Sequence, residues 1–587
     1  MEKWFVAAKK ADFEEWSREF HISTVLARIL RNRDLTTKAE LEKFLHGTLK
    51  DCYSPWLLKD MDKAVEQILE AIEKEITIRV IGDYDVDGIC ASYILTKGLQ
   101  ILGANADTAI PHRIHDGYGL NESLIEEAKA DGVGLIVTCD NGIAAAPQIA
   151  LANSLGIQVI VTDHHEVPYV MENGLRREIL PDALAVVDPK QEQCGYPFSG
   201  ICGGVVAYKL MVALNEKTGN PALTEALEEF LEFAAFATVC DVMELKDENR
   251  IIVKEGLKRL RNTKNQGLRA LMEVNTLEPG KLSGYHLGFV LGPCMNATGR
   301  LDTAKRALEL LQSSTKVEAY EAARELKELN DSRKNLTLIG VEEAVTYIEE
   351  NHMAEDKVMV IYLPEVHESL AGIIAGRVKE RYNHPAFVLT KGEEGVKGSG
   401  RSIEGYHMYE AMTEVKHLFT KYGGHAMAAG LSIGEENVDV LRRELNAKCT
   451  LTEADFIPKV HIDVPMPMEY ANEQIADELE LLEPFGVGNP KPLFAQKDLL
   501  FCAGYRMGAN KSFARFMVQT PEGQRKKLLY FGDLEKFEAF LNEKYGSESM
   551  QALFDGRGSF KVSVVYQLGK NTYMGKTEVQ YVMQNYC

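Results

Sequence analysis

The sequence lacks several features that mark exported, membrane-bound or disulfide-stabilised proteins. No uninterrupted apolar run approaches the roughly 18 residues of a membrane span, and the first residues, MEKWFVAAKKADFEEW, reach acidic side chains before any apolar core of signal-peptide length. The ten cysteines are scattered singly without a CxxC pair, which argues against a disulfide framework and a zinc ribbon. We therefore expect a soluble, cytoplasmic protein that folds throughout.

Positive charge is scarce, with 66 Lys and Arg against 87 Asp and Glu and a net charge of −21. This balance disfavours a polyanionic partner, because phosphates are bound mainly through Lys and Arg. The charge is unevenly distributed, however. From Lys491 onward there are 14 Lys and Arg against 9 Asp and Glu, so this tail is basic while the preceding residues are strongly acidic.

At 587 residues the chain exceeds the size of one hydrophobic core, which indicates several domains. Helical periodicity covers residues 1 to about 75. From Thr77, short β-branched runs alternate with helical ones, which predicts βαβ units and a mainly parallel sheet. We expect an α/β multidomain protein with these parts: an N-terminal helical region (1–75), an α/β domain (76–240), a helical connector (241–350), a second α/β domain (351–460) and a small β-barrel or sandwich (461–587).

Acidic and imidazole side chains directly follow several of the apolar runs. In a parallel α/β sheet, ligands bind at the carboxyl ends of the strands. Like charges gathered there in a low dielectric are costly unless cations neutralise them. The side chains in question are Asp83, Asp85 and Asp87 in GDYDVDG, Asp140 in TCDNG, Asp163, His164 and His165 in TDHHE, and Asp241 in VCDVMEL.

Each of these residues also has a simpler interpretation when taken alone. A single Asp after a strand is most often a helix N-cap, an Asp-Gly pair is typical of a turn, and a lone histidine is more often structural than a ligand. Their convergence favours a metal site. Carboxylates with one or two imidazoles and no thiolate suit Mn²⁺ or Mg²⁺, and the surplus of ligands predicts two ions, an arrangement suited to phosphoester hydrolysis.

The motifs GDYDVDG, TCDNG, TDHHE and VCDVMEL, in this order, resemble the four motifs of the DHH phosphoesterase superfamily. Further segments are similar to the RecJ family within it: PCMNATGR, GSGRSIEG, KYGGHAMAAGLSI and LEPFGVGNPKPLF. The resemblance spans nearly the whole chain. It implies that residues 76–240 form a DHH catalytic domain, 351–460 a DHHA1-like domain and 461–587 an OB-like nucleic-acid-binding barrel.

The family's residue roles carry over to the matching positions. The implied metal ligands are Asp85, Asp87, Asp140, His164 and Asp241, with Asp83 as a further ligand or an outer acid. His165 is implied to lie on the phosphate side and to complete the catalytic set, and Asp163 to orient an imidazole. The implied substrate and phosphate contacts are Arg113, Asn296, Arg300, Ser399, Arg401 and His425. In the basic tail, Phe513, Phe516, Tyr530 and Tyr566 are candidates for base stacking, although barrel core is the more common place for such side chains.

The resemblance implies a 5′→3′ exonuclease of single-stranded DNA that uses two divalent ions, Mn²⁺ or Mg²⁺, and releases 5′-mononucleotides in DNA repair and recombination. A helicase and a single-strand-binding protein are the implied partners. The rival interpretations are a DHH phosphodiesterase for short oligonucleotides or cyclic dinucleotides, a DHH pyrophosphatase, and a non-catalytic DHH scaffold in a replication complex. The first two lack the basic barrel tail, and the intact ligand positions argue against the scaffold.

Four positions depart from the family pattern: Cys294 replaces an Arg, Val366 precedes His367, Ser369 replaces a Gly, and Gly376 replaces a Ser. These departures concern nucleotide contacts rather than metal chemistry.

Overall fold

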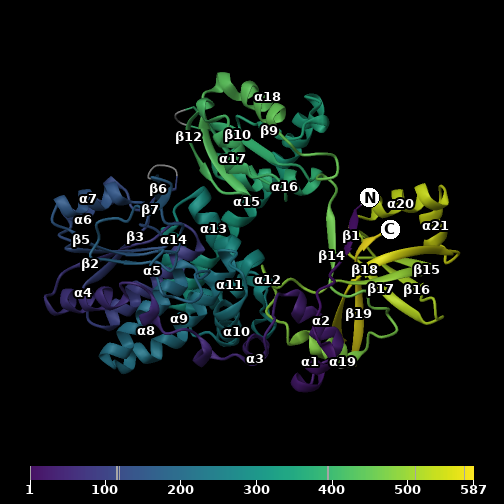
Figure 1. Cartoon of the computed structure of the whole chain (residues 1–587), viewed down its shortest axis with the longest axis horizontal. Coiled ribbons are helices and arrows are strands. Elements are labelled where there is room, and N and C mark those ends of the chain that lie inside the picture. Colours follow the sequence, from purple (N-terminus) through teal and green to yellow (C-terminus); the bar gives the residue numbers. More distant parts are fainter. Residues whose placement is uncertain (1, 114–116, 118, 393–394, 509, 574–575) are drawn as a thin grey trace. The chain divides into compact units, whose positions relative to one another are not determined.

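The computed structural model describes residues 2–113, 117, 119–392, 395–508, 510–573 and 576–587 (Figure 1). The chain forms two compact units. The first comprises Met1–Asp51, Glu244–Ile251 and Lys459–Cys587, and the second comprises Cys52–Met243 and Ile252–Pro458. Within these described ranges, no helix is both long enough and apolar enough to cross a membrane.

A five-stranded parallel sheet lies at the centre of the first α/β domain, as predicted. Its order is β3-β2-β4-β5-β8, with β2 Ile78–Ile81, β3 Ala106–Ala109, β4 Leu135–Cys139, β5 Gln158–Thr162 and β8 Ala185–Val187. Because β3 lies on one side of β2 and β4 on the other, the winding direction changes between β2 and β4. In doubly wound sheets this switch point is where ligands bind.

Helices cover both faces of this sheet (Figure 1). On one face are α6 Glu122–Ala130 and α7 Ala146–Ser154, and on the other α4 Met61–Glu73, α5 Val86–Ile101 and α8 Gly203–Thr218. The sheet is therefore buried on both sides, which explains why every residue of β2 and β4 is buried rather than every second one. Between β5 and β8 the chain adds an exposed hairpin that the sequence pattern did not predict, β6 Tyr169–Glu172 and β7 Leu175–Glu178.

Helices also dominate the described residues from 203 to 350, a range that contains the predicted helical connector. It includes α9 Pro221–Cys240, α10 Asp247–Leu260, α11 Gln266–Val274, α12 Gly284–His286, a π-helical turn Leu287–Leu291, α13 Gly292–Leu301, α14 Lys305–Gln312 and the 35-residue α15 Lys316–Glu350. A capping box at Thr315 and Glu318 starts α15, and this helix leads into the second α/β domain.

The second α/β domain is built on a mixed five-stranded sheet of order β12-β13-β11-β10-β9. Its strands are β9 Met359–Tyr362, β10 Ala386–Gly392, β11 Gly395–Arg401, β12 Phe419–Gly424 and β13 Ala428–Ile433. The helix α16 Ala371–Tyr382 packs with α15 on one face, and α17 Met408–Thr413 and α18 Val438–Lys448 pack on the other (Figure 1). The strand β11 carries Ser399 and Arg401.

The C-terminal residues form a closed five-stranded barrel of order β15-β16-β17-β19-β18. The strands are β15 Phe494–Met507, β16 Phe513–Gln519, β17 Arg525–Tyr530, β18 Phe560–Tyr573 and β19 Lys576–Tyr586, with α20 Leu534–Tyr545 and α21 Ser549–Phe554 between β17 and β18. All neighbouring strands are antiparallel except β17 and β19. The predicted OB-like barrel is thus confirmed.

The N-terminal residues share a core with this barrel. The helices α1 Phe13–Phe20, α2 Thr24–Asn32 and α3 Lys38–His46 bury Leu26, Leu30 and Leu41 in one cluster with barrel residues such as Phe494. The first residues, predicted to be helical, instead form the strand β1 Lys3–Val6, which pairs with β14 Lys459–Ile462. Local periodicity could not predict this pairing because the partner strand lies near the other end of the sequence.

A buried arginine joins three segments of this first unit. The guanidinium of Arg250 donates hydrogen bonds to the carbonyl oxygens of Phe44 at 2.9 Å, Leu482 at 2.8 Å and Leu481 at 2.7 Å. It also lies over the ring of Phe44, 3.9 Å from the centroid. These bonds compensate part of the cost of burying the charge, and they attach the first turn of α10 to the N-terminal helices and to the segment before the barrel.

Glu232 on α9 gives a stability prediction that depends on pH. Burial raises the pKa of its carboxyl to about 7, and its Oε2 atom has no hydrogen-bond partner among the described residues. A folded-state pKa above the unfolded value means that stability is highest below about pH 4.5 and declines as pH rises toward 7. At pH 8, Glu232→Gln should therefore increase the free energy of unfolding by up to about 3 kcal/mol and raise the melting temperature accordingly. At pH 5 it should change both quantities little.

The matched control is Glu225→Gln, which removes an exposed carboxylate from the same helix. It should leave the melting temperature nearly unchanged at both pH values. An equal effect of Glu232→Gln at pH 5 and pH 8 would contradict the assignment of a buried, costly charge.

Candidate metal centre and substrate pocket

Three neighbouring strands of the parallel sheet deliver acidic or imidazole side chains to the switch point. Asp83 follows β2 after one glycine, Asp140 follows β4 directly, and Asp163 and His164 follow β5. Asp85 is the N-cap of α5, where its side chain accepts the N–H groups of Asp87 and Gly88. The strand ends that the sequence analysis grouped therefore lie side by side.

Asp241 reaches the same place from a helix end. It is the residue that follows the last turn of α9. A carboxylate at a helix C-terminus lies at the negative end of the helix dipole, which is unfavourable without a nearby cation. The next residue, Val242, has φ +59, a region that β-branched residues rarely adopt.

His164 lies among the carboxylates. Its Nε2 atom is 3.0 Å from Asp140 Oδ1, 3.5 Å from Asp87 Oδ2 and 3.6 Å from Asp241 Oδ2. Potential ligand atoms lie within 4.8 Å of one another in three overlapping groups: Asp140, His164 and His165; Asp87, His164 and Asp241; and Asp83, Asp85 and Asp140. The structure thus brings together all seven residues that were predicted to be catalytic.

The protonation of these groups reflects their burial. Burial, followed by repulsion from Asp87 and Asp85, raises the pKa of the Asp140 carboxyl well above its usual value and that of Asp241 to about 8. Burial and then the charge of Asp85 likewise raise the pKa of Asp83. Burial lowers the pKa of His164, which keeps its imidazole neutral and able to act as a ligand.

These features fit divalent cations. Several carboxylates and one neutral imidazole form an oxygen-rich donor set without thiolate, which suits Mn²⁺ or Mg²⁺. His164 Nδ1 and Asp83 Oδ1 are buried and have no hydrogen-bond partner among the described residues. Asp140 has φ +60, so the chain accepts a strained backbone at the residue whose carboxylate lies 3.0 Å from His164 Nε2. Cations would offset the repulsion between the buried carboxylates.

Asp163 orients the imidazole of His165, whereas it contacts His164 only through the backbone N–H group. Its Oδ1 accepts the N–H group of His164 at 2.7 Å and lies 2.7 Å from His165 Nδ1, while its Oδ2 accepts the N–H group of Ile143 at 2.9 Å. Burial alone would lower the pKa of His165, but the hydrogen bond to Asp163 raises it to about 9. Neither Asp163 nor Asp140 caps a helix, because the next helix after Asp140 begins at Ala146 and β6 follows Asp163.

Two glycines that the sequence analysis did not single out support the centre. The N–H groups of Gly203 and Gly204, at the start of α8, donate to Asp87 Oδ2 and Oδ1, both at 2.7 Å. A Cβ atom on Gly203 would lie 2.7 Å from Asp140 Cβ, and one on Gly204 would lie 2.6 Å from Ala237 Cβ. In the sequence, these positions are marked by a pair of glycines at the start of an apolar helical segment, which does not by itself predict contact with Asp87.

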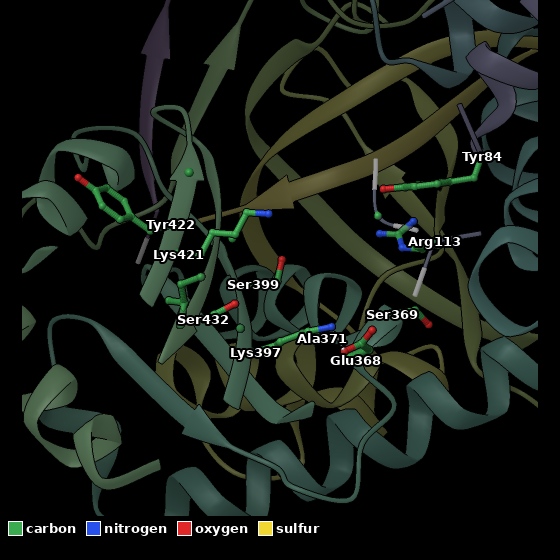
Figure 2. Close-up of a pocket in the computed structure, with 15 residues that line it drawn as sticks. Tyr84, Arg113, Glu368, Ser369, Ala371, Lys397, Ser399, Lys421, Tyr422 and Ser432 are labelled. Carbon is green, nitrogen blue, oxygen red and sulfur yellow. Dashed lines mark ion pairs between the residues drawn. The ribbon is translucent and has the colours of Figure 1, made fainter. Parts of the chain in front are cut away.

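A pocket of about 490 Å³ lies next to this centre (Figure 2). Tyr84, between Asp83 and Asp85 in the sequence, lines one side together with Arg113, whose guanidinium is 4.7 Å from the Tyr84 ring centroid. Residues of the second α/β domain line the other side, among them Ser369, Lys397, Ser399, Lys421 and Tyr422. The pocket therefore opens between the two α/β domains of the second unit.

The predicted phosphate contacts differ in their surroundings. Arg401 Nη1 donates to Ser399 Oγ at 3.2 Å, and Arg300 Nη1 donates to the carbonyl oxygen of Ser369 at 2.6 Å. Burial and then the charge of Arg113 lower the pKa of both arginines, that of Arg300 to about 10. Three guanidinium groups that repel one another in this way favour an anion between them.

Four of the six predicted contacts are not among the described residues that line the pocket: Arg300, Arg401, Asn296 and His425. Asn296 Oδ1 accepts the N–H group of Val86, so its amide supports the start of α5. His425 is exposed after the end of β12. The pocket also includes Lys397, paired with Glu368 at 2.9 Å, and Lys421, which the sequence analysis did not single out. Lys397 lies two residues before Ser399 on β11, and this spacing on one strand face was an available signal.

The positions that depart from the family pattern have local partners. Cys294 is buried in α13, with its Sγ 3.4 Å from Asn330 Nδ2. Ser369 Oγ is 2.7 Å from His367 Nδ1, and a Cβ on Gly376 would lie 4.0 Å from Arg401 Cγ.

The barrel aromatics divide into core and surface residues. Phe516, Tyr530 and Tyr566 are buried in the barrel core, so these three stacking candidates are wrong. Phe513 is exposed and contacts the exposed Phe531 at 5.2 Å between ring centroids. Tyr505 is also exposed, with Arg515 over its ring.

Three family models match the chain. The DHH family, N-terminal domain, matches residues 77–238, the DHHA1 domain matches residues 355–450 and the RecJ OB domain matches residues 462–585. These matches confirm the predicted combination of DHH, DHHA1-like and OB-like domains, while the proposed boundaries between them stay a prediction.

Curated relatives cover most of the chain. The single-stranded-DNA-specific exonuclease RecJ of Escherichia coli is 33% identical over 582 residues, which is 96% of this chain and 95% of that protein. RecJ of Salmonella typhimurium is 36% identical over 490 residues, 80% of this chain and 82% of that protein. RecJ of Bacillus subtilis is 36% identical over 512 residues, 86% of this chain, although the match spans 63% of that longer protein.

Solved structures agree with these relatives. The crystal structure of RecJ from Thermus thermophilus in complex with Mn²⁺ matches with a TM-score of 0.81 and 26% identity, covering 100% of this chain and 79% of that chain. The same protein in complex with Mg²⁺ matches with a TM-score of 0.74. With the motifs, the three domain matches and relatives above 30% identity along nearly their full length, the chain belongs to the RecJ family of the DHH superfamily.

Proposed function

We propose that the chain is a metal-dependent exonuclease that hydrolyses single-stranded DNA from the 5′ end and releases 5′-mononucleotides. The observation that carries this proposal is the buried cluster of carboxylates around His164, joined through Tyr84 to a pocket beside three arginines. In the reaction water adds across the P–O3′ bond, its hydroxyl to phosphorus and its proton to the departing 3′-oxygen. The next nucleotide keeps the 5′-phosphate, so the cycle can repeat.

The proposed metal ligands are Asp85, Asp87, Asp140, His164 and Asp241, with Asp83 as a further ligand or an outer acid. A pair of Mn²⁺ or Mg²⁺ ions at these residues would supply positive charge to the phosphoryl transition state and lower the pKa of an attacking water. The N–H groups of Gly203 and Gly204 fix the orientation of Asp87, and the cap at Asp85 fixes the start of α5.

His165 is proposed to act on the phosphate side. With Asp163 at its Nδ1, the imidazole has a raised pKa and a fixed ring orientation. A cationic imidazole held in this way can donate a hydrogen bond to a phosphoryl oxygen or a proton to a leaving oxygen. Asp163 therefore serves His165 as a positioning residue.

The arginines are proposed to hold the substrate phosphates. Burial and then the charge of Arg113 lower the pKa of Arg300 and of Arg401, and Ser399 adds a hydroxyl beside Arg401. Phosphate oxygens match the planar guanidinium donors in bidentate geometry. A pocket of about 490 Å³ is in the size range of sites for one small ligand, so it suits a single strand rather than a duplex.

We place this activity in the cytoplasm, in DNA repair and recombination, with a helicase that supplies single strands and a single-strand-binding protein that covers them. The exposed barrel residues Tyr505, Phe513 and Phe531, with nearby basic side chains such as Arg515, support binding of single-stranded nucleic acid.

The test is digestion of 5′-labelled and 3′-labelled single strands, and of the matching duplex, with Mn²⁺ or Mg²⁺ and with EDTA. We expect mononucleotide release from the 5′ label on single strands only, and none with EDTA or with Asp140→Ala. Equal cutting of duplex would refute strand specificity, early release of the 3′ label would refute the direction, and an active Asp140→Ala variant would refute the proposed metal centre.

A further inference from the structure

Two large aromatic side chains are exposed on α12 and on the π-helical turn that follows it. Tyr285 is 63% exposed and Phe289 is 70% exposed, and their rings stack with centroids 5.1 Å apart and planes 22° apart. Exposed aromatic surface is costly in water and is typical of binding surfaces. Single π-helical turns within helices are also frequent at functional sites.

The turn is held in a defined orientation. His286 Nδ1 accepts the N–H group of Ser283 at 3.2 Å and lies 2.9 Å from its hydroxyl, forming a capping box at the start of α12. The ring of Tyr285 also contacts His286 edge-on, 5.8 Å between centroids. The aromatic pair is thus a preorganised surface and not two freely rotating side chains.

The same turn packs against the residues that precede Asp241. Cys240 Sγ donates to the carbonyl oxygen of Leu287 at 3.6 Å, and a Cβ on Gly292 would lie 2.5 Å from that sulfur. The residue after Asp241, Val242, is itself 64% exposed. On its C-terminal side the turn continues into α13, which carries Asn296 against the start of α5.

We propose that Tyr285 and Phe289 form a stacking subsite for nucleobases of a single DNA strand, continuous with the metal centre at Asp241. This inference rests on the proposed function, which requires a single strand to pass beside Asp241. Two parallel rings with an open face match the planar, sequence-independent surface that every base offers. A stack fixed to the backbone beside a metal ligand would hold the strand in register while the scissile phosphate is attacked.

The experiment uses the full-length chain and 5′-phosphorylated oligonucleotides that carry one abasic nucleotide at successive positions. For the wild type, kcat/KM should fall about tenfold, equivalent to about 1.4 kcal/mol, when the abasic site occupies the stacked position. The variants Tyr285→Ala and Phe289→Ala should each raise KM on intact DNA about tenfold. The double variant should be insensitive to an abasic site at that position, whereas Phe289→Trp should retain the wild-type pattern.

Val317→Ala is the matched control, because it removes an exposed apolar side chain from α15. It should leave KM and the abasic pattern unchanged. An unchanged KM in the double variant would overturn the subsite. The exposed surface of Tyr285 and Phe289 would then be better explained by contact with a protein partner. A raised KM with full abasic sensitivity would reduce the pair to a structural role. If the wild type digests no single-stranded DNA, the proposed function fails and the subsite fails with it.

Discussion

An Asp140→Asn variant is expected to hydrolyse single-stranded DNA at least about 10³-fold more slowly than the wild type, because loss of this proposed metal ligand removes several kcal/mol of transition-state stabilisation. Its carboxylate is buried, lies 3.0 Å from His164 Nε2 and belongs to two of the three groups of potential ligand atoms. Asparagine has nearly the same shape, so the loss reports charge and ligation rather than packing.

The same variant is expected to be more stable than the wild type in EDTA. Removing one of several buried carboxylates relieves repulsion that no cation offsets under those conditions. Added Mn²⁺ should raise the melting temperature of the wild type strongly and that of the variant much less. Asp62→Asn, which changes an exposed acid on α4, should alter neither property.

A variant that is less stable than the wild type in EDTA would contradict the proposed role of Asp140. If Asp140→Asn lowered stability in EDTA and left the response to Mn²⁺ intact, the carboxylate would be a structural hydrogen-bond acceptor and the metal would bind elsewhere. If Asp140→Asn hydrolysed single-stranded DNA at a rate within tenfold of the wild type, the metal would likewise bind elsewhere.

Gly203→Ala should produce the second large effect, a loss of about 10²-fold in kcat without contact between the new methyl group and the substrate. The added Cβ would lie 2.9 Å from Asp140 Cα and 2.7 Å from its Cβ, so either α8 or the strained residue Asp140 must move. A movement of α8 would also displace the two N–H groups that hold Asp87. Misplacement of catalytic groups by about 1 Å costs about 10²-fold in rate.

Gly280→Ala is the matched control, because a Cβ there meets nothing within 4 Å. Kinetics in a series of Mn²⁺ concentrations separate two outcomes for Gly203→Ala. We expect the Mn²⁺ concentration for half-maximal rate to rise together with the fall in kcat, because two proposed metal ligands, Asp87 and Asp140, shift. A fall in melting temperature with wild-type kcat and metal dependence would show that the glycine serves packing alone.

The sequence was sufficient to predict those residues of the candidate site that directly follow a strand. Asp83, Asp140 and His164 follow buried β-branched runs, and the carboxyl ends of parallel strands meet at one edge by geometry. The role of Gly203 could not be predicted, because it depends on how closely α8 approaches Asp140. Nor could the choice of His165 as the partner of Asp163, which depends on the conformation of the turn after β5.

The barrel aromatics show the same limit. Phe513 and Phe516 are three residues apart on β16, so they lie on opposite faces, and sequence alone did not reveal which face is inside. Irregularities in the pairing of β15 with β16 and β18 shift the register, which period-two patterning cannot follow. The domain classes were predictable because they rest on long motifs rather than on single positions.

The pairing of Lys3 with Lys459 has a consequence for how the molecule is made. During synthesis β1 and the helices that bury Leu26 and Leu41 leave the ribosome before their partner strand β14 and the barrel do. The residues of the second unit can complete their core before β14 and the barrel are synthesised. Until then the apolar side chains of the N-terminal helices lack the barrel residues that bury them. Deleting the barrel would leave this N-terminal segment permanently without its partner and its apolar side chains exposed.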